Sequence, residues 1–214
     1  MRRVMVVWGI IVLGSNVFAV TILDTTSNTP WGSVGTWGEG GTSSETIGQT
    51  FAVGTDNRLD YFTFFVADSL NPDYIDFAAY VMEWNGDRAT GPILFQTSAL
   101  TTTNNGGNNG WEAFTIDTGG LNLTQGQEYV AFFSTSQLFD GEIGWGWAAY
   151  AGESYTDGTF VYIDNGSDFS QLTTTSWVTN YPGGDLAFAM GFNIPEPATL
   201  LLLGLGGLLL RRKH

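Results

Sequence analysis

The stretch QEYVAFFSTS at residues 127–136 decides the fold, because both of its alternating faces are apolar. In an extended strand Tyr129 and Phe133 point to one face, and Val130 and Phe132 point to the other. Strands of this kind lie in the middle of a sheet that is covered on both sides. We therefore expect a covered sheet, or a sandwich with a further layer over its outer face.

Similar runs rich in Phe, Tyr, Val and Trp recur along the chain, separated by clusters of Gly, Asn, Asp and Thr that favour turns. No helical period is present between them. The pattern predicts an all-β domain, an antiparallel β-sandwich of jelly-roll type. Nine strands are expected, at residues 46–53, 59–67, 74–84, 92–98, 111–117, 127–135, 143–150, 158–164 and 185–192.

Two segments between the expected strands have no clear strand pattern. Residues 26–45 are poor in apolar side chains, and we expect an irregular segment that packs Trp31, Trp37 or both on the sandwich. Residues 165–184 are expected to form a long loop that contains Trp177 and Tyr181.

The N-terminal residues 1–19 have the pattern of a secretory signal peptide. Arg2 and Arg3 precede an apolar run at residues 4–13, and the small residue Ala19 ends a more polar stretch. Ten apolar residues are too few to span a bilayer, which takes about 20. We expect a signal helix that signal peptidase cleaves after Ala19, which leaves a body of residues 20–194.

The body is strongly acidic. Arg58 and Arg88 are its two cations, against 20 of the chain's 21 acidic residues, which gives a formal charge of −18. Nucleic acid is excluded as a partner, because phosphate binding needs clustered cations. Neutral sugars, divalent cations and other proteins remain as partners.

The body lacks the residues that most catalytic mechanisms need. The chain has no cysteine, and its one histidine is His214, so no catalytic triad, cysteine nucleophile or histidine zinc site can form in the body. We expect no cofactor and no enzymatic activity. A glycosidase that uses two carboxylates stays open as a weaker alternative.

One acidic stretch raises the hypothesis of a metal site. Asp164 to Asp168, DNGSD, places two carboxylates, an amide and a hydroxyl around a glycine, which are ligand types that calcium accepts. The spacing is not that of an EF-hand loop, and an ordinary Asx turn is the better interpretation. No metal site is assigned.

Trp145 and Trp147 are the candidate binding residues of the body. In EIGWGWAAY they share one face, while Gly144, Gly146 and Ala148 line the other. If the glycine face turns inward, the two indoles stand outside as a platform that stacks on sugar rings; if it turns outward, they belong to the core. The alternative function is therefore a carbohydrate-binding module.

The C-terminal residues 195–214 combine three features in order: Pro195, Glu196 and Pro197, then an apolar run at 198–210, then the basic tail Arg211, Arg212 and Lys213. The run spans about 20 Å as a helix, short of the roughly 30 Å hydrocarbon core of a bilayer. The basic tail favours a cytoplasmic end and an external body. The region resembles the PEP-CTERM sorting signal of Gram-negative bacteria that possess an exosortase.

This resemblance implies a route and a destination. Exosortase would recognise the C-terminal hydrophobic helix and cleave near Pro195-Glu196-Pro197, after a transient stay in the inner membrane. The protein would then reach the cell surface or the extracellular matrix, where such proteins are linked with exopolysaccharide and biofilm. Exosortase, signal peptidase and extracellular polysaccharide are thus the expected partners.

Overall fold

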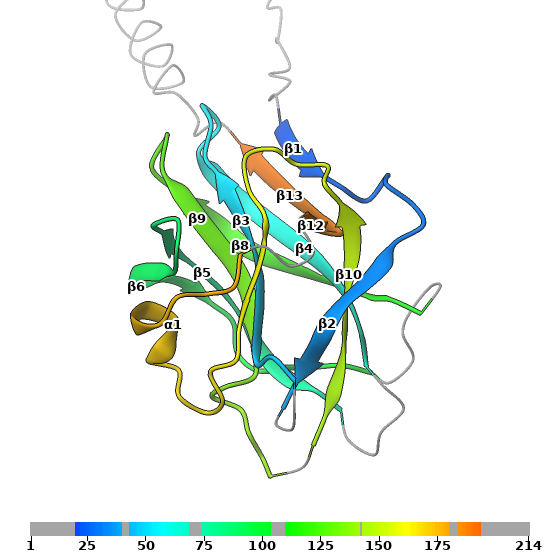
Figure 1. Ribbon diagram of the computed structural model, residues 1–214. Coiled ribbons are helices and arrows are strands. Elements are labelled where there is room, and N and C mark those ends of the chain that lie inside the picture. Colours follow the sequence, from blue (N-terminus) through cyan, green and yellow to red (C-terminus); the bar gives the residue numbers. More distant parts are fainter. Residues whose placement is uncertain are drawn as a thin grey trace, which may run out of the picture.

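The computed structural model describes residues 20–39, 43–68, 74–103, 110–141, 143–179 and 184–193. These residues form two antiparallel sheets packed face to face (Figure 1). The β-sandwich prediction is confirmed. The signal helix expected at residues 1–19 and the hydrophobic helix expected within 195–214 lie outside the described residues.

The first sheet is built on the long strand β4 (Arg58–Asp68). One edge of β4 pairs with β8 (Glu112–Asn122), and the other edge pairs with β13 and then with β10. β1 and β2 add to this sheet through β13 and β10. The bounds of these further strands are β1 Val20–Asp24, β2 Gly32–Gly38, β10 Trp145–Gly152, β12 Asp185–Leu186 and β13 Phe188–Asn193.

The second sheet has β9 (Glu128–Ser134) at its centre, between β3 and β5. Its hydrogen-bonded order is β11, β3, β9, β5 and β6, and a short β7 pairs with the start of β5. The bounds are β3 Thr46–Ala52, β5 Asp76–Trp84, β6 Ala89–Gln96, β7 Leu100–Thr101 and β11 Phe160–Ile163.

The two apolar faces of β9 are both buried, as its sequence predicts. Tyr129 and Phe133 enter the core between the sheets, where Phe133 packs 4.7 Å from Phe77 and 5.1 Å from Phe64 between ring centroids. Val130 and Phe132 enter a second apolar cluster on the outer face of the sheet. The central position of β9 therefore follows from its two-sided hydrophobicity.

The additional layer comes from residues 165–179. This segment contains a short helix, α1 (Gln171–Thr174), where the sequence predicted only a loop (Figure 1). Leu172 and Trp177 are buried in the outer cluster, and the Trp177 Nε1–H donates to the Leu172 carbonyl at 2.9 Å. The segment thus covers the outer face of the second sheet.

All nine expected strands are present, with the last divided into β12 and β13, but the expected number was too low, because β1, β2 and β7 are also strands. The expectation of an irregular segment at residues 26–45 was wrong in part, because Gly32–Gly38 forms β2. Glycine weakens strand propensity, and here pairing with β10 outweighs it. Trp31 and Trp37 both pack on the sandwich, as expected. Trp37 is fully buried in the core, and the ring centroids of Trp31 and Phe65 are 4.7 Å apart.

Across the described parts of the chain, no helix has the length and apolarity to span a membrane.

Candidate functional site

The first and last strands of the body lie side by side. β1 and β13 are antiparallel neighbours, and Val20 is the Cα partner of Asn193. The expected cleavage site Ala19 precedes Val20 directly, and Ile194 alone separates Asn193 from Pro195. Ala19, the motif Pro195 to Pro197 and the basic tail Arg211 to Lys213 are themselves outside the described residues. Both ends of the described chain emerge at the same end of the sandwich (Figure 1).

The glycine face of β10 turns inward. Gly144, Gly146 and Ala148 are buried, and a Cβ placed on Gly146 would lie 1.9 Å from the Ala67 carbonyl oxygen of β4. Only glycine permits this approach of the two strands. This is the arrangement in which the two tryptophans point away from the core.

Trp145 and Trp147 are half-buried on the outer face of the first sheet. Their ring centroids are 5.0 Å apart and the ring planes meet at 77°. Such edge-to-face contact is a favoured geometry for aromatic pairs. The two indoles therefore form a corner and do not lie in one flat plane, so a sugar ring could stack on one indole and contact the edge of the other.

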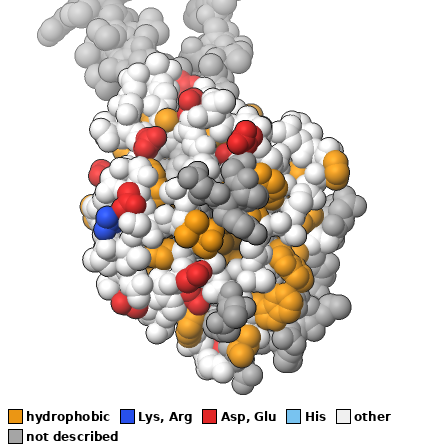
Figure 2. Space-filling view, viewed as in Figure 1, with side chains coloured by type: hydrophobic (Ala, Val, Ile, Leu, Met, Phe, Trp, Pro, Cys, Tyr) orange, Lys and Arg blue, Asp and Glu red, His pale blue; other side chains and the backbone are white. Residues whose placement is uncertain are grey.

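Further aromatic side chains continue this surface across the sheet. Trp147 is the Cα partner of Ala67, and Phe65 lies two residues along β4 from Ala67, on the same face. Trp31 packs on Phe65. We call Trp31, Phe65, Trp145 and Trp147 the aromatic band. Figure 2 shows hydrophobic side chains gathered at the lower right of one face, over β2 and β10.

Both cations of the body are engaged by acidic neighbours. The Arg58 Nε lies 3.3 Å from Asp60, and the Arg88 guanidinium lies 2.6 Å from Asp87 and donates to the Thr174 carbonyl. Neither belongs to the aromatic band. The band is therefore suited to neutral ligands and not to anionic ones.

Glu39, directly after β2, is a buried carboxylate that sequence reasoning did not single out. Its Oε1 accepts a hydrogen bond from the Asp76 backbone N–H at 3.0 Å, while Oε2 is buried without a hydrogen-bond partner among the described residues. Burial, with the nearby charges of Asp140 and Asp76, raises the pKa of Glu39 to about 7. A raised pKa suits a general acid, but Glu39 lines neither of the cavities at the ends of β3.

The stretch Asp164 to Asp168 is used internally. The Asp168 carboxylate accepts hydrogen bonds from the Ser170 backbone N–H and hydroxyl, and the buried Asn165 side chain accepts one from the Thr46 hydroxyl. This is the geometry of an Asx turn. In the described ranges, no group of three or more metal-ligating side chains occurs.

Comparison with known proteins identifies the C-terminal segment. A family model described as the PEP-CTERM protein-sorting motif matches residues 193–213, which include Pro195 to Pro197 and the basic tail. The motif implies export, membrane anchoring before sorting, and processing by exosortase. The match begins at Asn193, the last residue of β13, and leaves the rest of the body outside it. No curated protein and no solved structure matches the chain.

Proposed function

We propose that this chain is a non-enzymatic surface or extracellular-matrix protein that associates with exopolysaccharide in a biofilm. Signal peptidase releases the N-terminus after Ala19, and exosortase then processes the C-terminal segment. The observation that carries the proposal is the sorting motif at residues 193–213, attached with no linker to a sandwich whose two ends lie together. After sorting, the body remains outside the inner membrane.

The proposal that the body is not an enzyme follows from its residues. It contains no histidine and no cysteine, and Glu39, the one carboxylate with a strongly raised pKa among the described residues, is buried. A two-carboxylate glycosidase needs a general acid with a raised pKa that faces the second carboxylate across a substrate cleft. Glu39 instead links the end of β2 to the start of β5 through the Asp76 N–H, which is a structural task.

A second candidate function is carbohydrate binding by the aromatic band, and the inward glycine face of β10 favours it. The buried Gly146 leaves Trp147 and Trp145 on the outside, and Phe65 and Trp31 extend the surface across strands. Trp145 pairs with Gly38 at the end of β2, away from the β1 and β13 ends where the sorting motif begins. A polysaccharide could therefore reach the band while the C-terminal segment is still in the membrane.

Affinity electrophoresis of the full chain in gels that contain neutral polysaccharides tests this function. We expect retardation of the native chain and weaker retardation of a Trp145→Ala, Trp147→Ala double variant, because each indole contributes on the order of 1 kcal/mol by stacking. Ile93→Ala is the matched control, since it removes an exposed apolar side chain from the second sheet. Equal retardation of native and double variant, with circular dichroism unchanged, would contradict carbohydrate binding by the band.

A further inference from the structure

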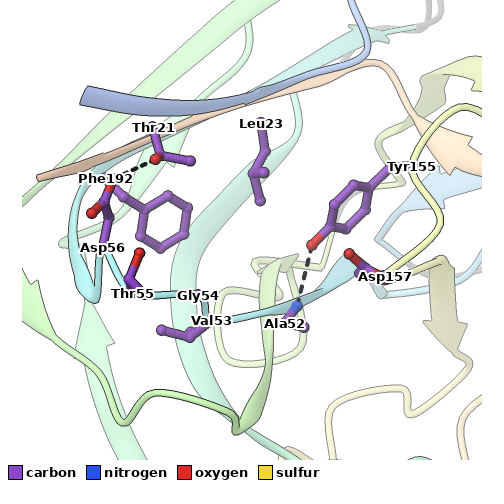
Figure 3. Close-up of a pocket in the computed structure, with 10 residues that line it drawn as sticks. All are labelled: Thr21, Leu23, Ala52, Val53, Gly54, Thr55, Asp56, Tyr155, Asp157 and Phe192. Carbon is purple, nitrogen blue, oxygen red and sulfur yellow. Dashed lines mark hydrogen bonds between the residues drawn. The ribbon is translucent and has the colours of Figure 1, made fainter. Parts of the chain in front are cut away.

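A cavity of about 300 Å³ opens between the two sheets at the end where the sorting segment begins (Figure 3). β1 and β13 form one side, the turn at residues 52–56 after β3 forms a second, and the loop after β10 forms a third. We call this cavity the tail-end pocket. Its volume is at the lower limit of ligand pockets, about 300–1,000 Å³, so it suits a small ligand.

The pocket is apolar in its middle and carries a carboxylate at each end (Figure 3). Leu23, Val53 and Phe192 supply apolar surface, and the ring of Tyr155 adds an aromatic wall. Asp56 and Asp157 supply two carboxylates from different elements (Figure 3). Apolar surface with a few convergent polar groups is the usual composition of a small-molecule site.

The aromatic wall is fixed by a buried network. The Ser154 and Tyr155 backbone N–H groups donate to Oδ2 of Asp185 at 3.0 and 2.7 Å, and Gln49 Nε2 donates to Oδ1 of Asp185 at 2.8 Å. Asp185 itself is 1% exposed. The Tyr155 ring also packs edge-to-face on Phe188, with centroids 5.7 Å apart. The wall is therefore held in place before any ligand arrives.

Polar groups of the pocket still have hydrogen-bonding capacity. The Tyr155 hydroxyl accepts a hydrogen bond from the Ala52 N–H at 3.3 Å. No described residue accepts a hydrogen bond from the Tyr155 hydroxyl. Burial and the nearby charge of Asp157 raise the pKa of Tyr155, so the phenol stays protonated as a donor. The Asp157 carboxylate makes no hydrogen bond or ion pair with another described residue, and Asp56 accepts one from the Thr21 hydroxyl.

We infer that the tail-end pocket binds a neutral sugar residue, at a chain end or a side branch of a polysaccharide. A sugar hydroxyl donates to the Asp157 carboxylate, the neighbouring Tyr155 hydroxyl donates to a sugar oxygen, and the apolar surface takes the C–H face of the ring. No Lys or Arg lines the pocket, and its two carboxylates repel phosphate and uronate groups. The choice of sugar as the ligand rests on the proposed association with polysaccharide, whereas the site is separate from the aromatic band.

Titration of the full chain, held in a detergent without a sugar headgroup, tests the site. The probes are glucose, galactose, mannose and N-acetylglucosamine, with glucuronate as the anionic and glucosamine as the cationic counterpart. Asp157→Asn removes the carboxylate charge, and Thr55→Trp fills the pocket from an exposed turn position. Glu83→Gln, an exposed carboxylate on β5, controls for net charge.

The native chain should bind at least one neutral sugar saturably and glucuronate at least tenfold more weakly. Asp157→Asn should weaken binding by about tenfold or more, as expected for a hydrogen bond to a charged group. Thr55→Trp should abolish binding, while Glu83→Gln and the double tryptophan variant should retain it. The site is overturned if no neutral sugar binds, if only glucosamine binds, or if both pocket variants bind like the native chain. Polysaccharide retardation that still depends on Trp145 and Trp147 would then leave the proposed function standing.

Discussion

Asn193 lies directly opposite Val20 in the antiparallel pair of β13 and β1. The residue expected to become the mature N-terminus is therefore paired within the sheet with the residue at which the sorting motif begins. The two expected processing sites, after Ala19 and near Pro195, lie in segments attached to neighbouring strands.

Replacing Pro195, Glu196 and Pro197 with alanines should block maturation. Proline disfavours a helical backbone at the residue before it and cannot continue a helix, whereas alanine favours helix, so the exchange alters the backbone preference of the motif. We expect uncleaved precursor to accumulate in the inner membrane, measured by fractionation and mass spectrometry of the intact chain. Gln125→Ala, in an exposed turn, is the control. Normal maturation of the triple variant would refute exosortase processing at this motif.

Gly146→Ala should destabilise the body strongly. The new Cβ would lie 1.9 Å from the Ala67 carbonyl oxygen, so β10 must move away from β4. Overpacking of this kind costs typically about 1–3 kcal/mol, and a backbone clash places this variant at the upper end. Gly54→Ala is a matched control, because nothing lies within 4 Å of its added Cβ. Urea denaturation followed by circular dichroism should separate the two, and equal midpoints would show that β10 does not pack as described.

The sequence predicts the sandwich well because the side chains of its central strands indicate where those strands lie in the sheet. Strand β9 is apolar on both faces, with Tyr129 and Phe133 on one face and Val130 and Phe132 on the other. Such a strand requires a covered outer face, and α1 and Trp177 cover it. β2 could not be predicted in the same way. Its Gly32, Gly35 and Gly38 suppress any alternation, and its strand conformation depends on pairing with β10, a partner more than a hundred residues away.

The candidate sites also differ in how far the sequence alone predicts them. The sorting motif is a local pattern and is readable from the sequence alone. Whether Trp145 and Trp147 face outward depends on the approach of Ala67 to Gly146, which the sequence allows but does not determine. The tail-end pocket joins Leu23, Asp56, Tyr155 and Phe192 from four distant segments, and no local pattern marks them.

Glu39→Gln should remove a pH dependence of stability. The pKa of Glu39 is about 7 in the folded protein, above the ordinary value of 4.5 for the unfolded chain. Between these values the folded state binds more protons, so Glu39 lowers the free energy of unfolding as the pH rises from about 4.5 to about 7. The variant should therefore be more stable than the native chain at pH 8, by on the order of 1–3 kcal/mol, and similar to it near pH 4.

Thermal melts of both chains across pH 4–8 provide the measurement for Glu39. Glu128→Gln, at an exposed position on β9, changes net charge equally and should leave the native pH profile intact. A native profile in Glu39→Gln, or the same shift in both variants, would show that the buried carboxylate is not the source of the dependence.

Trp177→Ala should cost far more stability than Trp147→Ala. Trp177 is 4% exposed and packs edge-to-face against both Trp84 and Phe132 at 5.5 Å, so its removal leaves a cavity in the outer layer. Such truncations cost about 3–5 kcal/mol. Trp147 is half-buried, and water can fill the space that it leaves, so we expect roughly half that loss. Trp177→Phe keeps a ring but removes the Nε1–H donor to the Leu172 carbonyl, and should cost an intermediate amount. Urea denaturation of the three variants gives the order directly. If Trp147→Ala lost as much stability as Trp177→Ala or more, Trp147 would belong to the core. The aromatic band could then not be a binding surface.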